Sequence, residues 1–469
     1  MAQIGYHRYH IETNSVPDIV KCPSRFRVKV QKHRLILFLI EEILRYPTKK
    51  KVIFSRPCIY EVYGRPVGGL APREHLCVGC LRCTTEHPDW VQIHPNPKFE
   101  QMGDSYFSAE YVDAINYEAR TGMIPVKGAG FRGKFGGAGW NSMWTDMSEI
   151  VRPTRDGIHG REFISTVVDI GAKPGFLTFD GQGLPAGKTP QIISIPLPVL
   201  FDMPPVTMKS RKLITILAEA ARRIETLAVM PVADIIESGL EGSHIIPLVT
   251  GEQLDMLQAL PFAPGLIEMA GGDKTHYSQI KSWFPESLVC LRLPFSNRLQ
   301  EDLLRYADSG IRVFHLVADY HGRGAGGDFM LELVRRAHQA LVAAGCRDEV
   351  TLLGSGGIVA AEHVPKAIIC GLDAVALDTA LLVALQAQFA DDCIDPPTSQ
   401  VQLPKKLDLD WGVQRLENML ASWRDQMLEV MGAMGLREVR RLRGEVGRAM
   451  FQHDLEKEAF QEISGYGEK

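Results

Sequence analysis

The stretch Val350-Thr-Leu-Leu-Gly-Ser-Gly-Gly-Ile358 joins a short apolar run to a glycine-rich turn. An apolar run of this length bounded by turn residues is typical of a buried strand. Glycine lets the backbone come close to a bound group, and the free N–H groups at the start of a following helix attract phosphate. The stretch therefore predicts a buried strand that leads into a phosphate-binding turn.

Similar apolar runs recur along the chain, and several are separated by stretches of helical periodicity. Buried parallel strands that alternate with helices favour a closed (β/α)8 TIM barrel, and a doubly wound open sheet is the alternative. The predicted strands are 195–201, 227–232, 244–249, 265–270, 288–293, 313–318, 350–353 and 374–377. The clearest predicted helices between them are 211–225, 298–308, 329–344 and 362–370.

Composition places the chain among ordinary globular proteins. Its 469 residues are too many for one typical domain, and 45% are hydrophobic while 23% are charged. The net charge of −4 argues against nucleic acid as the main partner. No apolar run is long enough for a transmembrane helix, and the first residues lack the apolar core of a signal peptide. We therefore expect a cytoplasmic protein whose nine cysteines are reduced or bound to metal.

The run Cys77-Val-Gly-Cys80-Leu-Arg-Cys83 has the thiol spacing of bacterial ferredoxins, where a fourth cysteine followed by proline completes the pattern. Here His87 occupies that fourth place and Pro88 follows it. Cys58 lies upstream in the same segment and offers another thiolate. The sequence predicts a [4Fe-4S] cluster held by Cys58 and the three cysteines of the run. The alternatives are His87 as the fourth ligand, a three-iron cluster, or a structural zinc ion.

Changes in composition divide the chain into five predicted parts. The second part is rich in Pro, Gly and Cys, which suits a small domain whose metal centre replaces a large core. Helical spacing predicts a helix over 31–46 in the first part and apolar packing over 413–436 in the last, on the barrel or on a partner. The parts are an N-terminal helical segment (1–51), a ferredoxin-like iron–sulfur module (52–100), a Gly-rich connecting segment packed on the barrel (101–190), the barrel (191–395) and a helical C-terminal tail (396–469).

Two strand ends predict a phosphate site. In TIM barrels the active site lies at the C-terminal ends of the strands, and phosphate binds after strands seven and eight. The candidate residues there are Gly354, Ser355, Gly356, Gly357, Asp378 and Thr379. The alternative is that the glycines form only a tight turn.

Three other residues are candidates for catalysis. Asp319 and His321 lie in a loop after the sixth strand that also carries a phenol and a guanidinium, although a loop salt bridge is the alternative. Arg292 lies late in the fifth strand, where it would place a positive charge near a reduced flavin or an anionic substrate. A buried arginine without an anionic partner is costly, which favours a functional role.

Several motifs resemble the FMN-binding glutamate synthase domain family, in its ferredoxin-containing, glutamate synthase-related form. They are Val151-Arg-Pro-Thr-Arg-Asp-Gly-Ile-His-Gly-Arg-Glu162, Val168-Asp-Ile-Gly171 and the barrel ending Gly-Ser-Gly-Gly-Ile…Leu-Asp-Ala-Val-Ala-Leu-Asp-Thr-Ala-Leu-Leu. The resemblance covers roughly residues 55 to 450. It implies an FMN-bearing barrel fed by an iron–sulfur module. It also implies that Gly356, Gly357, Asp378 and Thr379 hold the FMN phosphate and that Arg292 lies beside the flavin.

The sequence departs from the family pattern at several places, including a Gly-Glu-Gly-Gly loop that has no good counterpart here. Met203-Pro-Pro-Val-Thr-Met208 stands where the family has a Met-Ser-Phe-Gly-Ala-like stretch. The segment from Leu385 to Cys393 has a single cysteine, so it lacks the loop that holds a three-iron cluster in the family. Residue 2 is alanine, so no N-terminal cysteine is expected to hydrolyse glutamine.

The function expected from these features is that of an oxidoreductase subunit. Electrons would pass between the [4Fe-4S] cluster and FMN to reduce or oxidise an amino or imino acid-type substrate at a CH–NH2 group, without glutaminase activity. We expect other redox subunits or a ferredoxin-type electron donor as partners, in an oligomer or hetero-complex. One alternative is a non-catalytic electron-transfer or scaffolding subunit whose barrel lacks flavin, and another is a zinc-stabilised scaffold.

Overall fold

The computed structural model describes residues 9–49, 52–53, 58–63, 71–125, 136–145, 164–172, 179–186, 191–205, 210–271, 273–397 and 399–465. These residues form two compact units. The cysteine unit contains residues 18–114 and Pro125, and the barrel unit contains residues 9–17, 115–124 and those from 136 onward. The motif from Val151 to Glu162 and the last residues of the stretch from Met203 to Met208 lie outside the described residues.

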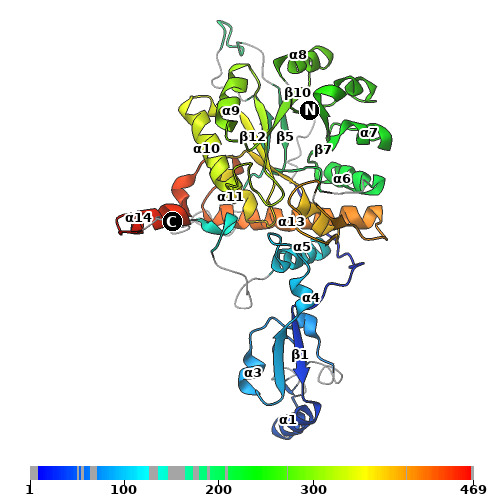
Figure 1. Ribbon diagram of the computed structural model, residues 1–469. Helices are drawn as coiled ribbons and strands as arrows, with labels where there is room; N and C mark the ends of the chain where they lie inside the picture. The colour runs from blue at the N-terminus through cyan, green and yellow to red at the C-terminus, as the bar shows by residue number, and fades with distance from the viewer. Residues whose placement is uncertain are drawn as a thin grey trace. The chain divides into compact units, whose positions relative to one another are not determined.

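The barrel unit is built on a closed barrel of parallel strands (Figure 1). The last strand, β13, pairs with the first, β6, which completes the ring. The predicted (β/α)8 barrel is therefore confirmed, and the open-sheet alternative is wrong. The barrel strands are β6 (Val199–Phe201), β7 (Ala228–Pro231), β8 (Ile245–Thr250), β9 (Leu266–Ala270), β10 (Leu288–Pro294), β11 (Val313–Val317), β12 (Thr351–Ser355) and β13 (Ala374–Leu377).

Amphipathic helices cover the outside of the barrel (Figure 1). In α6 (Arg211–Ile224), Leu213, Ile216 and Leu217 are buried while the helix begins with exposed basic residues. This spacing of three and four residues gives the helix one apolar face, which packs toward the strands. The other helices of this layer are α7 (Val232–Ser238), α8 (Lys274–Trp283), α9 (Leu299–Asp308), α10 (Met330–Ala343), α11 (His363–Cys370) and α12 (Thr379–Ala384).

The strand predicted at 195–201 is wrong in its first half. There the structure has a separate strand, β5 (Ile192–Ile195), which pairs antiparallel with β4 (Val168–Gly171). Pro196 and Pro198 interrupt the run because proline has no N–H group for a strand ladder. The β4–β5 ribbon lies at the N-terminal end of the barrel strands, where the Thr351 hydroxyl donates to the Gly171 carbonyl at 2.9 Å.

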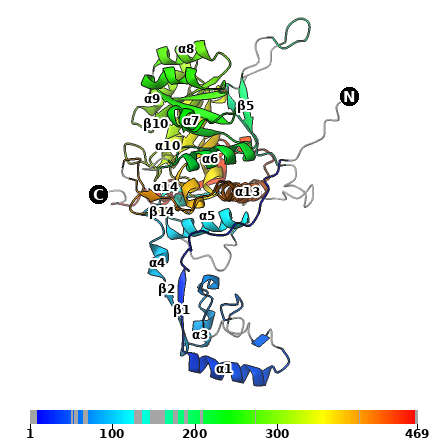
Figure 2. The ribbon, with the colours of Figure 1, turned by 90° about the vertical axis from the view of Figure 1, so that its right-hand side faces the viewer.

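A long C-terminal helix, α13 (Leu409–Ala433), packs against α6, α11 and α12 (Figures 1 and 2). Its fully buried Arg415 donates to the carbonyl of Ala384 and, at 2.9 Å, to the side chain of Asn116. The predicted packing of the tail on the barrel is confirmed for this helix. The remaining elements are α14 (Gln452–Phe460) and the paired strands β3 (Met143–Thr145) with β16 (Ala449–Phe451) and β14 (Gln388–Phe389) with β15 (Val401–Gln402).

The cysteine unit is organised around an antiparallel ribbon of β1 (Phe26–Val30) and β2 (Val91–Pro95). The predicted helix over 31–46 is confirmed as α1 (Lys32–Arg45), and α3 (Arg82–Glu86) begins within the cysteine run. Figure 2 shows both helices close to the ribbon. Helix α4 (Pro97–Glu100) also lies within this unit, while α5 (Ala109–Thr121) begins in this unit and ends among residues of the barrel unit. The five-part division and the ferredoxin-like character of residues 52–100 stay predictions.

Of the helices that the structure describes, none combines the length and apolar character needed to cross a membrane.

Candidate functional site

The structure brings the four predicted cluster cysteines together in the cysteine unit. Cys58 and Cys77 pack against the small core that also contains the buried Cys83. Burial, with a smaller effect of the neighbouring thiols of Cys83, Cys58 and Cys80, raises the pKa of Cys77 to about 11 against a hydrogen bond from Gly79 that lowers it. Each of the other three sulfur atoms is therefore near enough to act on Cys77, as ligands of one centre must be.

Two backbone N–H groups in or next to the cysteine run donate to its sulfur atoms, that of Gly79 to Cys77 and that of Thr84 to Cys83. Gly79 has φ +69° and Leu81 has φ +61°, both in the left-handed region. A Cβ atom on Gly79 would lie 2.5 Å from the ring of Phe26, so a side chain does not fit there. For Leu81 this conformation costs on the order of 1 kcal/mol. Successive N–H groups in such turns form anion-binding hollows that are found at iron–sulfur sites.

The surroundings favour Cys58 over His87 as the fourth ligand. The ring of His87 packs edge-on against Phe38, with 4.7 Å between centroids, and against Trp90 at 5.0 Å. The thiol of Cys58, in contrast, acts on the pKa of both Cys77 and Cys83. His87 therefore has an aromatic packing role, whereas Cys58 belongs to the group of thiols.

A structural zinc ion is the alternative to a cluster at these thiols. Within the part of the chain that the structure describes, no three side chains of His, Cys, Asp or Glu are close enough to hold one metal ion. A tetrahedral zinc site would need sulfur atoms about 3.8 Å apart, given its short Zn–S bonds. A [4Fe-4S] cluster is held by four thiolates, so the donor set present here fits such a cluster.

Arg292 lies inside the barrel, in a buried network of charged residues. Its guanidinium donates to Asp202 at 2.7 and 3.1 Å and to Glu268 at 2.7 Å. His315 Nδ1 lies 2.9 Å from the same Glu268 oxygen. Asp202, Glu268 and His315 are almost completely buried, while 19% of the Arg292 side chain is exposed. Arg292 therefore has two anionic partners within the chain itself.

The pKa values show that the network is ionised. Burial alone would raise the pKa of Asp202, but the charges of Arg292 and His315 outweigh it and hold that pKa below its usual value. For Glu268 the same two charges outweigh burial in the same direction. The positive charge of Arg292 is thus already compensated by two carboxylates.

The sequence interpretation missed Asp202, Glu268 and His315. The signal was present, since Glu268 and His315 interrupt the apolar runs of β9 and β11 at buried positions. A charged or titratable residue inside an otherwise apolar strand requires a partner, and that requirement applies to these two residues as much as to Arg292.

At the predicted phosphate turns, the structure has two buried hydroxyls without hydrogen-bond partners among the described residues: Ser355 Oγ and Thr379 Oγ1. They lie at the end of β12 and at the start of α12. Gly356 and Gly357 follow with φ +97° and +68°. Buried orphaned donors at a strand end suit the oxygens of a bound phosphate, so these residues fit the phosphate of FMN.

Asp378 joins the phosphate turns to the charged network. Its carboxylate accepts the N–H of Thr379, and burial raises its pKa to about 7. The charge of Asp202 raises this pKa and that of Arg292 lowers it, so all three groups lie near one another. At neutral pH this carboxyl is protonated in about half of the molecules, which limits its repulsion of a nearby anion.

The loop after β11 packs backbone to backbone against the turn after β12. A Cβ atom on Gly356 would lie 2.3 Å from the Asp319 carbonyl oxygen. The Asp319 carboxylate accepts the N–H groups of His321, at 3.0 Å, and of Arg323, at 2.7 Å. Asp319 thus holds the loop in shape, with His321 buried in it. Catalytic roles for these two residues stay predictions.

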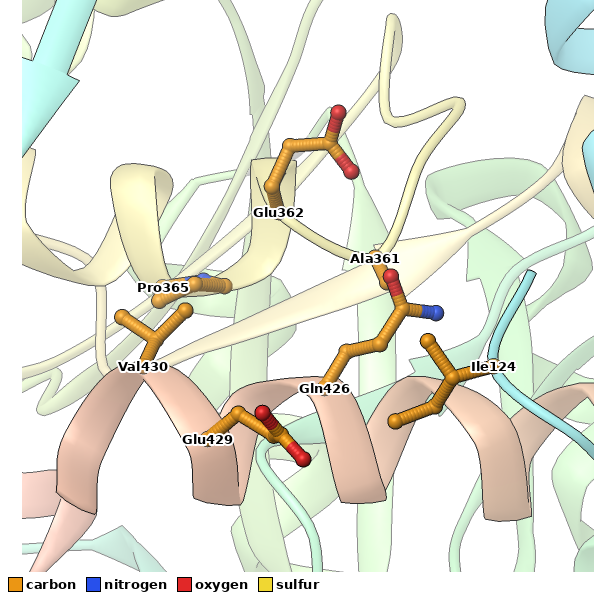
Figure 3. A pocket seen from close by; sticks show the side chains of 7 residues that line it. All are labelled: Ile124, Ala361, Glu362, Pro365, Gln426, Glu429 and Val430. Atoms are coloured by element: carbon orange, nitrogen blue, oxygen red, sulfur yellow. The ribbon is translucent and has the colours of Figure 1, made fainter. Parts of the chain in front are cut away.

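A small pocket lies elsewhere in the barrel unit, between α11 and α13 (Figure 3). Its volume is about 210 Å³, and Glu362, Gln426 and Glu429 line it together with apolar side chains. Gln426 is held by a 2.7 Å hydrogen bond to Glu118. Ligand pockets for drug-sized molecules are larger, at about 300 Å³ or more, so we assign no ligand to this one.

Buried carboxyls make the stability of the barrel unit depend on pH in two opposite ways. The pKa values of Asp202 and Glu268 are lowered on folding, so their stabilisation is present above about pH 4 and is lost as pH falls further. The pKa of Asp378 is raised to about 7, so its contribution is lost as pH rises through 7. The free energy of unfolding falls by roughly 4 kcal/mol between about pH 4 and 7, compared with a protein in which this carboxyl keeps its ordinary pKa.

We expect the urea midpoint to be highest in mildly acidic buffer and to fall on both sides. Asp378→Asn should remove most of the decline between about pH 4 and 7, the range between the unfolded and folded pKa values of this carboxyl, while leaving the acid limb unchanged. Circular dichroism at a series of pH values measures both. An unchanged decline toward alkaline pH in this variant would contradict the assignment to Asp378.

Comparison with known proteins shows a likeness to glutamate synthases. A family model described as a conserved region in glutamate synthase matches residues 321–437. The archaeal-type glutamate synthase (NADPH) of Dehalococcoides mccartyi is 24% identical over 471 residues, which cover 87% of this chain and 93% of that protein. The archaeal glutamate synthase (NADPH) of Methanocaldococcus jannaschii is 35% identical over 112 residues, 23% of this chain and 22% of that protein. These matches confirm the predicted resemblance to the FMN-binding glutamate synthase family.

Among solved structures, a flavocytochrome b2 variant with pyruvate bound has a TM-score of 0.41 and 12% identity, covering 66% of this chain and 76% of that one. A likeness at this level supports no inference about cofactor or substrate.

Proposed function

We propose that this chain, a relative of the FMN-binding glutamate synthases, is an iron–sulfur flavoprotein oxidoreductase subunit. A [4Fe-4S] cluster held by Cys58, Cys77, Cys80 and Cys83 exchanges electrons with FMN at the mouth of the barrel, for reduction or oxidation of an amino or imino acid. The observation that carries the proposal is the grouping of four thiols, two of which accept backbone N–H groups, in the same chain as a glutamate synthase-type barrel. The glutamate synthase relatives support an oxidoreductase.

In the barrel, Ser355 and Thr379 would hold the FMN phosphate with the backbone of Gly356 and Gly357, next to Gly354. When bound, FMN converts between one-electron and two-electron transfer. Arg292 keeps Asp202 and Glu268 ionised at the base of this site.

Two groups at the barrel mouth would bind, release or transfer protons. Asp378, with its pKa of about 7, can hold or release a proton at neutral pH. Asp319 shapes the loop that carries His321, the proposed proton-transfer residue for the substrate.

The proposal includes a source of single electrons, because an iron–sulfur cluster accepts one electron at a time. Other redox subunits or a ferredoxin-type donor would supply them in an oligomer or hetero-complex. A cytoplasmic location is part of the proposal, since it keeps the thiols reduced.

One observation favours a second candidate, a non-catalytic electron-transfer or scaffolding subunit whose barrel lacks flavin. Arg292 is neutralised by Asp202 and Glu268, so it offers less positive charge to a reduced flavin than the sequence suggested.

The absorption spectrum and metal content of anaerobically purified protein test both candidates. We expect flavin bands on top of broad iron–sulfur absorption, with FMN released on denaturation. Iron–sulfur absorption without flavin would favour the second candidate, and a colourless protein that contains zinc would overturn both.

A further inference from the structure

Tyr63 contacts one of the cluster cysteines directly. Its Oη lies 3.6 Å from Cys83 Sγ, within hydrogen-bond range for sulfur, and both side chains are buried. The ring packs edge-on against Trp90, with 5.9 Å between centroids. The phenol is therefore fixed in place, with its hydroxyl on the sulfur.

Tyr63 is the donor in this hydrogen bond. A thiolate that binds iron has no proton and can only accept, whereas a phenol can donate. An ordinary phenol has a pKa of about 10, so the Tyr63 hydroxyl carries its proton at neutral pH. Cys83 also accepts the backbone N–H of Thr84.

We propose that Tyr63 is a positioning residue that raises the reduction potential of the cluster through its O–H···S bond to Cys83. The inference rests on the proposed function, since it requires the cluster. Reduction places more negative charge on the thiolate sulfurs, and a donor aimed at one of them stabilises the reduced form more than the oxidised form. Adding one electron makes or breaks no bond and moves no proton, because Tyr63 keeps its hydrogen.

The test is a redox titration of the full-length protein, with dithionite as the reductant and electron paramagnetic resonance as the readout. Tyr63→Phe keeps the ring and removes only the donor. We expect the iron and sulfide content to stay unchanged and the midpoint potential to become more negative. The expected shift is at most about 59 mV, which for one electron is a tenfold change in the ratio of reduced to oxidised cluster. Tyr60→Phe, which removes an exposed phenol two positions from Cys58, is the matched control and should leave the midpoint unchanged.

A second variant covers the case in which Tyr63→Phe fails to fold. Fluorotyrosine incorporated at position 63 keeps the ring and makes its hydroxyl a stronger donor, so the midpoint should move to a more positive value. A midpoint unchanged in both variants, with full iron content, would overturn the role of Tyr63 alone. Absence of iron from the unmodified protein would instead overturn the proposed function, and this inference with it.

Discussion

Replacing Cys58 with alanine is expected to lower the iron bound by anaerobically purified protein from about four atoms per chain to three or fewer. The thiol of Cys58 lies near Cys77 and Cys83, and its loss leaves three thiolates. The His87→Ala variant should keep its iron, because that ring packs against Phe38 and Trp90. Iron and acid-labile sulfide per chain, with the electron paramagnetic resonance spectrum, measure the difference.

Two controls separate loss of a ligand from loss of the fold. Cys346→Ala removes a thiol of the barrel unit and should change neither iron content nor spectrum. The thermal midpoint of His87→Ala should fall, since two aromatic contacts are lost, without release of iron. If iron survived Cys58→Ala but not His87→Ala, the proposed ligand set would be wrong.

Replacing Arg292 with methionine should destabilise the barrel unit by about 3–5 kcal/mol, because it leaves buried carboxylates without their partner. Asp202 and Glu268 are 2% and 0% exposed, so water cannot take the place of the guanidinium. Urea unfolding followed by circular dichroism measures the loss. Adding Asp202→Asn and Glu268→Gln to this variant should recover much of the lost stability.

Arg347 provides a matched control at the opposite end of the barrel. It is also buried, and it donates to Asp373 at 2.9 Å and to the Val350 carbonyl at 2.7 Å, just before β12 and β13 begin. Arg347→Met should cost a similar amount of stability but leave bound FMN unchanged, whereas Arg292→Met should lower both. An Arg292→Met variant as stable as the unmodified protein would contradict the charged network.

Much of the barrel could be predicted because its strands are buried on both faces and read as apolar runs. The strand predicted at 288–293 is β10, Leu288–Pro294, and the helix predicted at 329–344 is α10, Met330–Ala343. The prediction failed in the first half of 195–201, where apolar residues continue across Pro196 and Pro198 but the hydrogen-bond ladder does not. Apolar character alone therefore overestimates a strand that contains proline.

The candidate sites differ in how far apart their residues lie along the sequence. The cysteine run is a single short segment, so its spacing alone indicated a metal centre. The charged network forms only when the barrel closes, since Asp202 and Arg292 are 90 residues apart. Tyr63 was missed for the same reason, because its contact with Cys83 depends on how two loops pack.

The ring-closing contacts of the barrel also affect its synthesis. The hydrogen bond between Gly171 and Thr351 joins positions 180 residues apart, and the pairing of β6 with β13 joins Val199 to Val375, which is almost as far along the chain. At ribosomal speeds of about 5–20 residues per second, the β4–β5 ribbon leaves the ribosome roughly 10 to 40 seconds before its partner exists. During that interval β6 presents an unpaired strand edge, and such edges can pair with another nascent chain before the barrel closes.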